Sequence, residues 1–89
     1  MNERQRAHNR FPHARIRDHM RNFGAGGFAA GSVELIEKVL YIFLEDITKK
    51  TIPFARRANR IGINVEDIKI SLRCFHKDIY EKIFPRTNE

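Results

Sequence analysis

Apolar residues recur along this chain at helical spacing, and the longest such pattern predicts a central helix. This helix is expected to start near Ser32 as its N-cap, or a turn earlier near Ala29, and to reach about Asn59. Its apolar residues recur at steps of three and four, with Thr51 filling one step: Val33, Ile36, Leu40, Phe43, Ile47, Phe54 and Ala58. A second face carries Leu35, Val39 and Ile42. A helix that is apolar on two sides needs more packing partners than short helices and a loop can offer.

Pro53 falls inside this predicted helix. Proline has no backbone N–H, so the hydrogen bond to the carbonyl of Lys49 is lost, and the ring crowds that carbonyl. The sequence therefore predicts a kink at this point. A full break of the helix at residues 52–53 is the alternative.

A short helix is predicted before the central one. It has Pro12 in its first turn and ends at Gly24, a residue suited to a helix C-terminus. Its apolar stripe consists of Ile16, Met20 and Phe23. A glycine-rich loop follows over residues 24–31, with Phe28 as one apolar anchor.

Two further helical segments are predicted after the central helix. Asn64 is expected to be an N-cap, with Asp67 three residues later. The apolar stripe of this helix consists of Ile68, Leu72 and Phe75. A last segment runs from His76 to Phe84 and is stopped by Pro85. The predicted fold class is all-α: a short helix, a long central helix, a short helix and a C-terminal helical segment.

A chain of 89 residues supports one domain, whose core is marginal without additional stabilisation. Cys74 is the single cysteine, so no internal disulfide can form, and with no secretory signal recognised we expect a reducing compartment. The longest apolar run, residues 39–44, is far too short for a membrane span. Pairing with another subunit is therefore the expected source of stability.

The net charge of +6 is unevenly distributed. Residues 1–22 carry six arginines and two acidic residues, while the first lysine is Lys38. Guanidinium groups match phosphate oxygens in geometry, so this end of the chain is a candidate nucleic-acid contact. For residues 1–10 an inert, solvated tail is an equally good interpretation.

No pattern in the chain indicates catalysis or metal binding. Gly24–Ala29 fits the spacing of a dinucleotide-binding loop, but no strand is predicted before it. The four histidines and Cys74 match no zinc spacing. The adjacent carboxylates at 45–46 and 66–67 are best interpreted as helix charges. We therefore expect no enzyme, no cofactor, no metal and no small-molecule substrate.

The central helix and the segments that follow it resemble the histone fold. The similarity is carried by Ile42–Ile47, Phe54–Arg60 and Ile63–Ile68. Residues 16–73 can be laid against core histone four without a gap, and residues 54–73 are also similar to centromere protein S and the archaeal histones. Arg60 and Asp67 match the family's structural ion pair between the second loop and the third helix.

The resemblance implies a handshake dimer with another histone-fold chain, in which the two long helices cross. The expected dimer interface consists of Val33, Ile36, Val39, Leu40, Phe43 and Ile47. An inter-dimer contact would use Phe54, Arg57 and Ile70. Duplex DNA would lie over the paired first helices and over the sites where the first loop of one chain meets the second loop of the other. Phosphates, not bases, would be contacted.

The expected DNA-binding residues are Arg4, Arg6, Arg10, Arg15, Arg17, Arg21, Arg57 and Arg60. Several positions depart from core histone four. The basic first-loop residue falls on Gly27, the Lys-Thr of the second loop on Ile61 and Gly62, and the second arginine of the first helix on Asp18. These losses weaken the case for nucleosome-style wrapping and fit a divergent histone or an assembly subunit.

The predicted function is that of a chromatin protein that pairs with another histone fold and binds duplex DNA without sequence preference, as a divergent core histone four. We expect it at the nucleus or chromosome, or in a nucleoid or virion if the source is archaeal or viral. The alternatives are a DNA-binding subunit similar to centromere protein S, and a TFIID-type assembly subunit with little DNA binding. The predicted organisation is a basic flexible tail (1–10), a histone-fold domain (11–75) and a C-terminal helix and tail (76–89).

Overall fold

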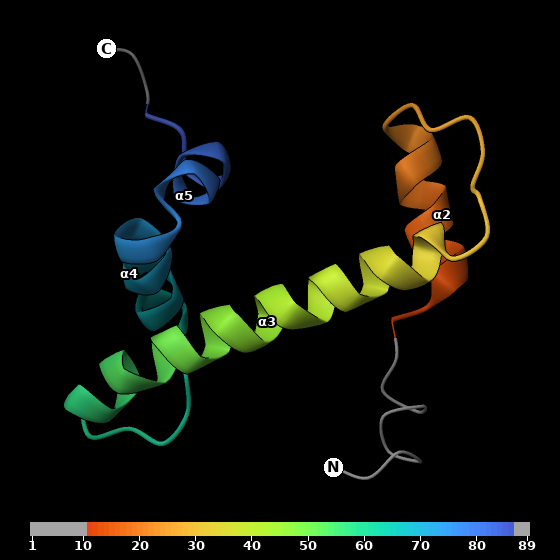
Figure 1. Ribbon diagram of the computed structural model, residues 1–89. Coiled ribbons are helices and arrows are strands. Elements are labelled where there is room, and N and C mark those ends of the chain that lie inside the picture. Colours follow the sequence, from red (N-terminus) through yellow and green to blue (C-terminus); the bar gives the residue numbers. More distant parts are fainter. Residues whose placement is uncertain (1–10, 87–89) are drawn as a thin grey trace, which may run out of the picture. The chain divides into compact units, whose positions relative to one another are not determined.

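The structure is a computed structural model that describes residues 11–86. Within this range the chain is all-α, as predicted, and contains four helices and no strand (Figure 1). The helices are α2 (His13–Asn22), α3 (Ser32–Arg57), α4 (Val65–Phe75) and α5 (Lys77–Ile83). The tail predicted for residues 1–10, with Arg4, Arg6 and Arg10, lies outside the described residues.

The chain divides between Ile42 and Phe43, inside α3, into two compact units. In the first unit, Ile16 of α2 and Val33 near the beginning of α3 are buried. Next to them the imidazole Nε2 of His13 lies 3.0 Å from Oε1 of the buried Glu37. The rings of Phe11 and Tyr41 also contact each other, with centroids 4.6 Å apart, so the first unit is held by buried apolar side chains, a polar pair and a ring contact. Nothing in residues 11–86 forms a helix long and apolar enough to cross a membrane.

Helix α2 ends at Asn22, before Phe23, the last residue of its predicted apolar stripe. Gly24 has φ +112°, and the amides of Gly24 and Ala25 donate to the carbonyls of Arg21 and Met20 at 3.0 Å each. This is a Schellman C-cap, which only a residue without a side chain adopts easily. Phe23, expected in the stripe, lies at the C-cap past the last helical residue and is 88% exposed. No element of its unit covers it.

The central helix starts and continues somewhat differently from the prediction. Ser32 is its first helical residue rather than its N-cap, and the Ser32 hydroxyl donates to the carbonyl of Ala29 (2.7 Å). At Pro53 the helix neither breaks nor ends, but runs four residues further to Arg57. The break at 52–53 is therefore wrong. Pro53 removes one hydrogen bond near the end of a 26-residue helix, where few intrahelical bonds remain to be disturbed.

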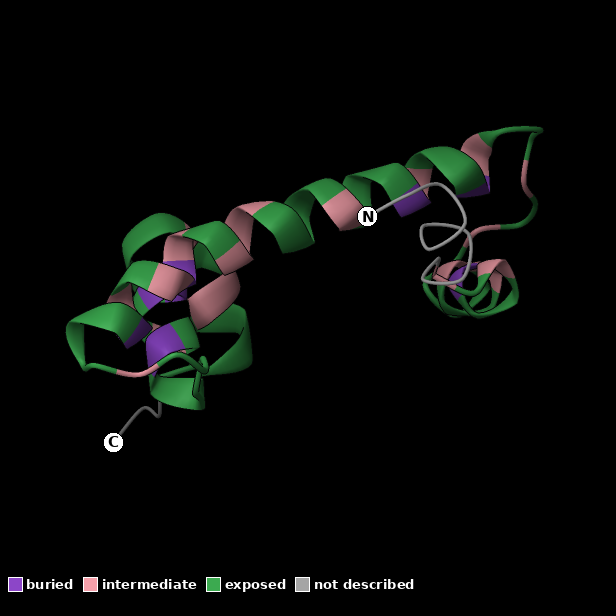
Figure 2. Cartoon of the chain, turned by 90° about the horizontal axis from the view of Figure 1, so that it is seen from below, coloured by how far each residue is buried: buried purple, intermediate pink, exposed green. Residues whose placement is uncertain are grey.

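In the second unit, the buried residues come from the last turns of α3 and from α4 (Figure 2). They are Thr51, Ala55, Asp67, Ser71 and Leu72. Three of the five are polar, and only Leu72 of the predicted α4 stripe is buried, because α3 of the same chain covers a narrow face of α4. Ile68 and Phe75 remain exposed. The unit thus buries few apolar side chains.

The turn after α3 is a second Schellman cap. Asn59 takes the left-handed conformation (φ 59°), the Asn59 amide donates to the carbonyl of Arg56 (2.9 Å), and the Arg60 amide donates to that of Ala55 (3.0 Å). Asparagine tolerates this conformation better than most residues with a side chain. The cap brings Arg60 to the beginning of the second loop, opposite the N-terminus of α4.

Candidate nucleic-acid interface

Three arginines on α2 form the basic surface of the first unit. Arg15 and Arg21 are exposed and Arg17 is half-buried. Arg17 and Arg21 are four residues apart and share one side of the helix, whereas Ile16 points into the core. The α2 arginines are therefore held on a short, rigid element and remain open to an anionic partner.

Arg21 is oriented by the glycine-rich loop. Its guanidinium carbon lies 5.1 Å from the centre of the Phe28 ring, a cation–π arrangement. Its Nη1 also donates to Oδ1 of Asp18 at 3.2 Å, but both side chains are exposed, so solvent screens this pair. Phe28 thus acts as the predicted apolar anchor of the loop and restricts the guanidinium without neutralising it.

The second unit carries arginines at the end of α3. Arg56 and Arg57 are both exposed, and the guanidinium of Arg57 lies 5.6 Å from the ring centre of Phe54. Arg57 and Phe54 thus lie together, and this neighbourhood suits both roles predicted for Arg57, phosphate contact and contact between dimers. Ile70, also assigned to that contact, is exposed.

Arg60 is engaged inside its own chain. Its Nη1 and Nη2 donate to Oδ2 and Oδ1 of Asp67 at 2.6 and 2.8 Å, a bidentate pair. Asp67 also closes a capping box, since its Oδ2 accepts from the amide of Asn64 (2.9 Å) while Oδ1 of Asn64 accepts from the amide of Asp67 (3.0 Å). The guanidinium fork of Arg60 is therefore already occupied by a carboxylate.

The electrostatic consequence appears at Asp67. The Arg60 guanidinium, together with the amide of Asn64, lowers the pKa of this carboxyl from its ordinary 3.8 to about 2. Asp67 is 3% exposed, so the ion pair sits at the junction of the second loop and α4 rather than on the open surface. This geometry stabilises the loop and leaves Arg60 few donors for a phosphate.

The residues predicted for the dimer interface differ in exposure. Val33 is only 4% exposed within its own chain, so it has little surface left for a partner. Ile36 and Ile47 are half-buried, while Val39, Leu40 and Phe43 are exposed. The second apolar face of α3 is more open still, with Leu35 61% and Ile42 66% exposed. Most of the apolar surface of α3 is thus uncovered.

One basic cluster was not anticipated from the sequence. Lys69, Arg73 and Lys77 recur every four residues across α4 and the beginning of α5, and this spacing was the available signal. Arg73 and Lys77 line a hollow together with the ring of Tyr80. Within residues 11–86, no three His, Cys, Asp or Glu side chains gather as they would to hold a metal ion.

Comparison with known proteins agrees with this architecture. No curated protein matches the chain closely enough to count as a relative. A family described as "Histone-like transcription factor (CBF/NF-Y) and archaeal histone" matches residues 9–72, which span α2, α3 and most of α4. Because this match covers well over half of the chain, the protein belongs to the histone-fold family of histone-like transcription factors and archaeal histones.

Proposed function

We propose that this protein is a histone-fold subunit that pairs with a second histone-fold chain and binds duplex DNA without sequence preference. The observation that carries the proposal is the uncovered apolar surface of α3. Leu35, Val39 and Ile42 are all exposed on one helical face, and Leu40 and Phe43 on another. Exposed apolar surface on this scale is typical of a binding interface rather than of an isolated monomer.

A second histone fold is the partner that fits this surface. The family to which the chain belongs is built on paired folds, and crossing of two long helices would cover both apolar faces of α3 at once. Large apolar interfaces of this kind are characteristic of obligate dimers. Within the pair, the side chains of Phe43 and Leu40 would be buried near the crossing.

DNA binding is proposed for the α2 arginines of this pair. Arg15, Arg17 and Arg21 present guanidinium groups from a rigid helix, and Arg21 is oriented by Phe28. Such contacts hold phosphates and carry no base information. The location proposed on this basis is the chromosome, in a nucleus or nucleoid. The finer assignment, a divergent core histone four, rests on the resemblance of residues 16–73.

Two measurements test the proposal on the full chain. Light scattering coupled to gel filtration should give a mass above the 10.5 kDa of one chain, for the chain alone or with a co-expressed histone-fold partner. Fluorescence anisotropy with unrelated duplexes of equal length should give similar affinities that fall steeply with salt. Arg17→Gln combined with Arg21→Gln should reduce the salt slope by about 2, because two phosphate contacts are lost.

A TFIID-type assembly subunit with little DNA binding is the second candidate, and specific observations favour it. Arg60 is committed to Asp67, and Gly27 and Gly62 stand where core histone four has basic or hydrogen-bonding residues. A Cβ added at Gly27 or Gly62 would meet no atom within 4 Å, so packing in this chain does not require glycine there. A stable dimer whose DNA affinity is weak at 50 mM salt would support this candidate and contradict the first.

A further inference from the structure

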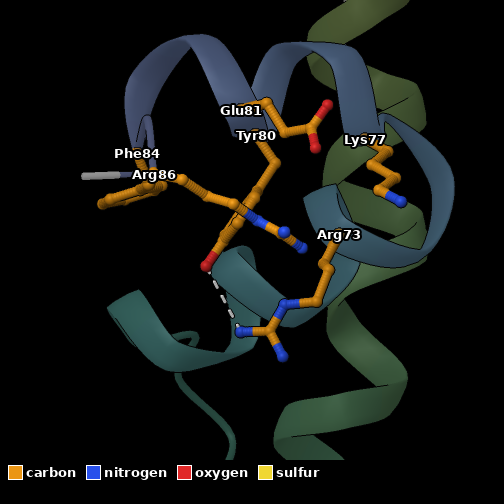
Figure 3. A pocket seen from close by; sticks show the side chains of 6 residues that line it. All are labelled: Arg73, Lys77, Tyr80, Glu81, Phe84 and Arg86. Atoms are coloured by element: carbon orange, nitrogen blue, oxygen red, sulfur yellow. Dashed lines mark hydrogen bonds between the residues drawn. The ribbon is translucent and has the colours of Figure 1, made fainter. Parts of the chain in front are cut away.

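We propose that the hollow between α4 and α5 is a second phosphate-binding surface, through which the protein contacts the backbone of duplex DNA outside the region matched by its family. The hollow measures about 480 Å³ and lies between two helices of the same unit (Figure 3). It is lined by Arg73, Lys77, Tyr80, Glu81, Phe84 and Arg86. The inference takes duplex DNA as the polyanion from the proposed function, but it concerns a different surface.

The charge of the hollow favours an anion. Three of its lining residues are basic and one, Glu81, is acidic. Over residues 69–86 the chain has five basic and two acidic residues, a net charge of +3. Among residues 11–86 no carboxylate lies within ion-pair distance of Arg73, Lys77 or Arg86. These cations therefore differ from Arg60, whose charge is matched by Asp67.

The two aromatic rings hold cations in place. The guanidinium carbon of Arg73 lies 5.2 Å from the ring centre of Tyr80, and its Nη2 donates to the Tyr80 hydroxyl at 3.3 Å. Lys69 Nζ lies 4.7 Å from the ring centre of Phe84, and the two rings are 5.0 Å apart. Because cations cover faces of both rings, the rings orient positive charge instead of offering platforms for stacked bases.

The lining of the hollow suits the phosphodiester groups of a nucleic-acid backbone better than it suits a small carboxylate ligand. The hollow is open to solvent on one side, and its cations lie on α4, on α5 and just after α5, so it can meet successive phosphates along a backbone. A guanidinium that is held by a ring loses less side-chain freedom when a phosphate binds. All six lining residues lie beyond residue 72, where the match to the histone-like family ends. The surface is therefore an addition to the fold.

The test uses the full chain, in the oligomeric form in which it is purified, and a fluorescent 30-base-pair duplex. Lys77→Gln is compared with Lys82→Gln, a matched control on the same helix that does not line the hollow. We expect Lys77→Gln to raise Kd about fivefold at 150 mM salt and to lower the salt slope by about 0.9, the effect of one lost phosphate contact. Lys82→Gln should stay within about twofold of the original protein.

Two further variants test whether the charges of the hollow set the affinity for DNA. Arg73→Gln with Lys77→Gln should lower the salt slope by about 2, and Glu81→Gln should tighten binding, because it removes the one opposing charge. Circular dichroism melting curves of every variant control for misfolding. Equal effects of Lys77→Gln and Lys82→Gln, or an unchanged slope in the double variant, would overturn the inference.

The outcomes also separate this inference from the proposed function. If the α4–α5 variants bind DNA normally while Arg17→Gln with Arg21→Gln loses affinity, the inference fails and the proposed function stands. If the original protein binds no duplex, both fail. Poly-L-glutamate serves as the competing polyanion: loss of its binding in the double variant, with DNA binding unchanged, would identify an acidic protein segment as the occupant and contradict the inference.

Discussion

At the scale of single residues, the Arg60–Asp67 pair is the contact that fixes the second loop. Asp67 combines a bidentate ion pair with a capping box, so one carboxylate ties the loop to the N-terminus of α4. Its pKa is lowered to about 2, chiefly by Arg60. A lowered carboxyl pKa stabilises the folded state at pH values above the unfolded value of 3.8, and this stabilisation is lost as the pH falls toward 2.

The first prediction follows from the direction of this pKa shift. The midpoint of thermal or urea unfolding should fall more between pH 5 and pH 3 in the original protein than in Asp67→Asn, which has no carboxyl to titrate at this position. Asparagine keeps an oxygen for the amide of Asn64, so the capping box is only partly disturbed. Identical acid sensitivity in both proteins would show that Asp67 contributes no pH-dependent stability.

The second prediction concerns Gly27. A Cβ at this position would meet nothing within 4 Å, and the residue does not take a positive φ. Gly27→Arg should therefore leave the melting temperature unchanged within about 1 °C, since neither packing nor backbone conformation opposes it. If DNA follows the first loop as in core histone four, the new guanidinium should increase the salt slope by about 0.9.

Gly26→Ala is the matched control, because the backbone there is equally open and the substitution adds no charge. It should leave both the affinity and the salt slope for a duplex unchanged. A stable Gly27→Arg variant with an unchanged slope would mean that DNA does not pass over this loop. That outcome would favour the assembly-subunit interpretation of the glycines.

At the scale of helices, the sequence predicted which helices form and in which order, but it did not predict which of their apolar residues are exposed in the single chain. The capping residues Gly24 and Asn64 marked helix boundaries because cap chemistry is local. Phe23 and Phe75 belong to the predicted apolar stripes but are exposed in the single chain, since periodicity reports which face is apolar and not which turns a neighbour covers. The α4–α5 hollow was missed because its cations lie on α4, on α5 and just after α5; the spacing of Arg73 and Lys77 hints at a basic face, but the packing of the two helices forms the hollow.

The third prediction concerns Pro53 in α3. The helix continues through this residue although proline cannot donate to the carbonyl of Lys49. Pro53→Ala restores that donor and should raise the free energy of unfolding by about 1–2 kcal/mol, less than the ~3 kcal/mol of a helix interior, because proline also restricts the unfolded chain. Urea unfolding of the assembled protein measures the change.

A matched control is Pro12→Ala, in the residue that precedes the first helical turn of α2. Proline is well accommodated at a helix start, so this substitution should change stability by less than about 0.5 kcal/mol. If Pro53→Ala is neutral or destabilising, the proline serves the assembled state, for instance by shaping the end of α3 for contact with another subunit.

At the scale of the whole molecule, the described part of the chain buries few apolar side chains. Within residues 11–86, the buried apolar side chains are Ile16, Val33, Ala55 and Leu72. The second apolar face of α3 predicts from the sequence that this helix has more apolar surface than the chain can cover. The exposure of Leu35 and Ile42 agrees with that prediction. The identity of the partner could not be predicted, because an apolar face specifies burial but not what provides it.

The last prediction tests that partner surface directly. Phe43→Asp places a carboxylate at the expected crossing of two long helices, where it would be buried in an apolar interface. The cost should be at least about 3 kcal/mol, so the dissociation constant of the pair should rise at least about a hundredfold. Light scattering coupled to gel filtration at micromolar protein would then report single chains of 10.5 kDa.

Two further variants make this result specific to the interface. Phe43 also contacts the ring of His76 within its own chain (5.1 Å between centroids), so Phe43→Asp also removes an internal contact. Leu35→Asp avoids that problem, because Leu35 is 61% exposed and its loss should disturb pairing more than the fold of the chain. Lys38→Gln, at an exposed position of α3, gives the same change in net charge and should pair normally. If both aspartate variants remain paired at nanomolar concentration, α3 does not form the dimer interface, and the handshake is wrong for this protein.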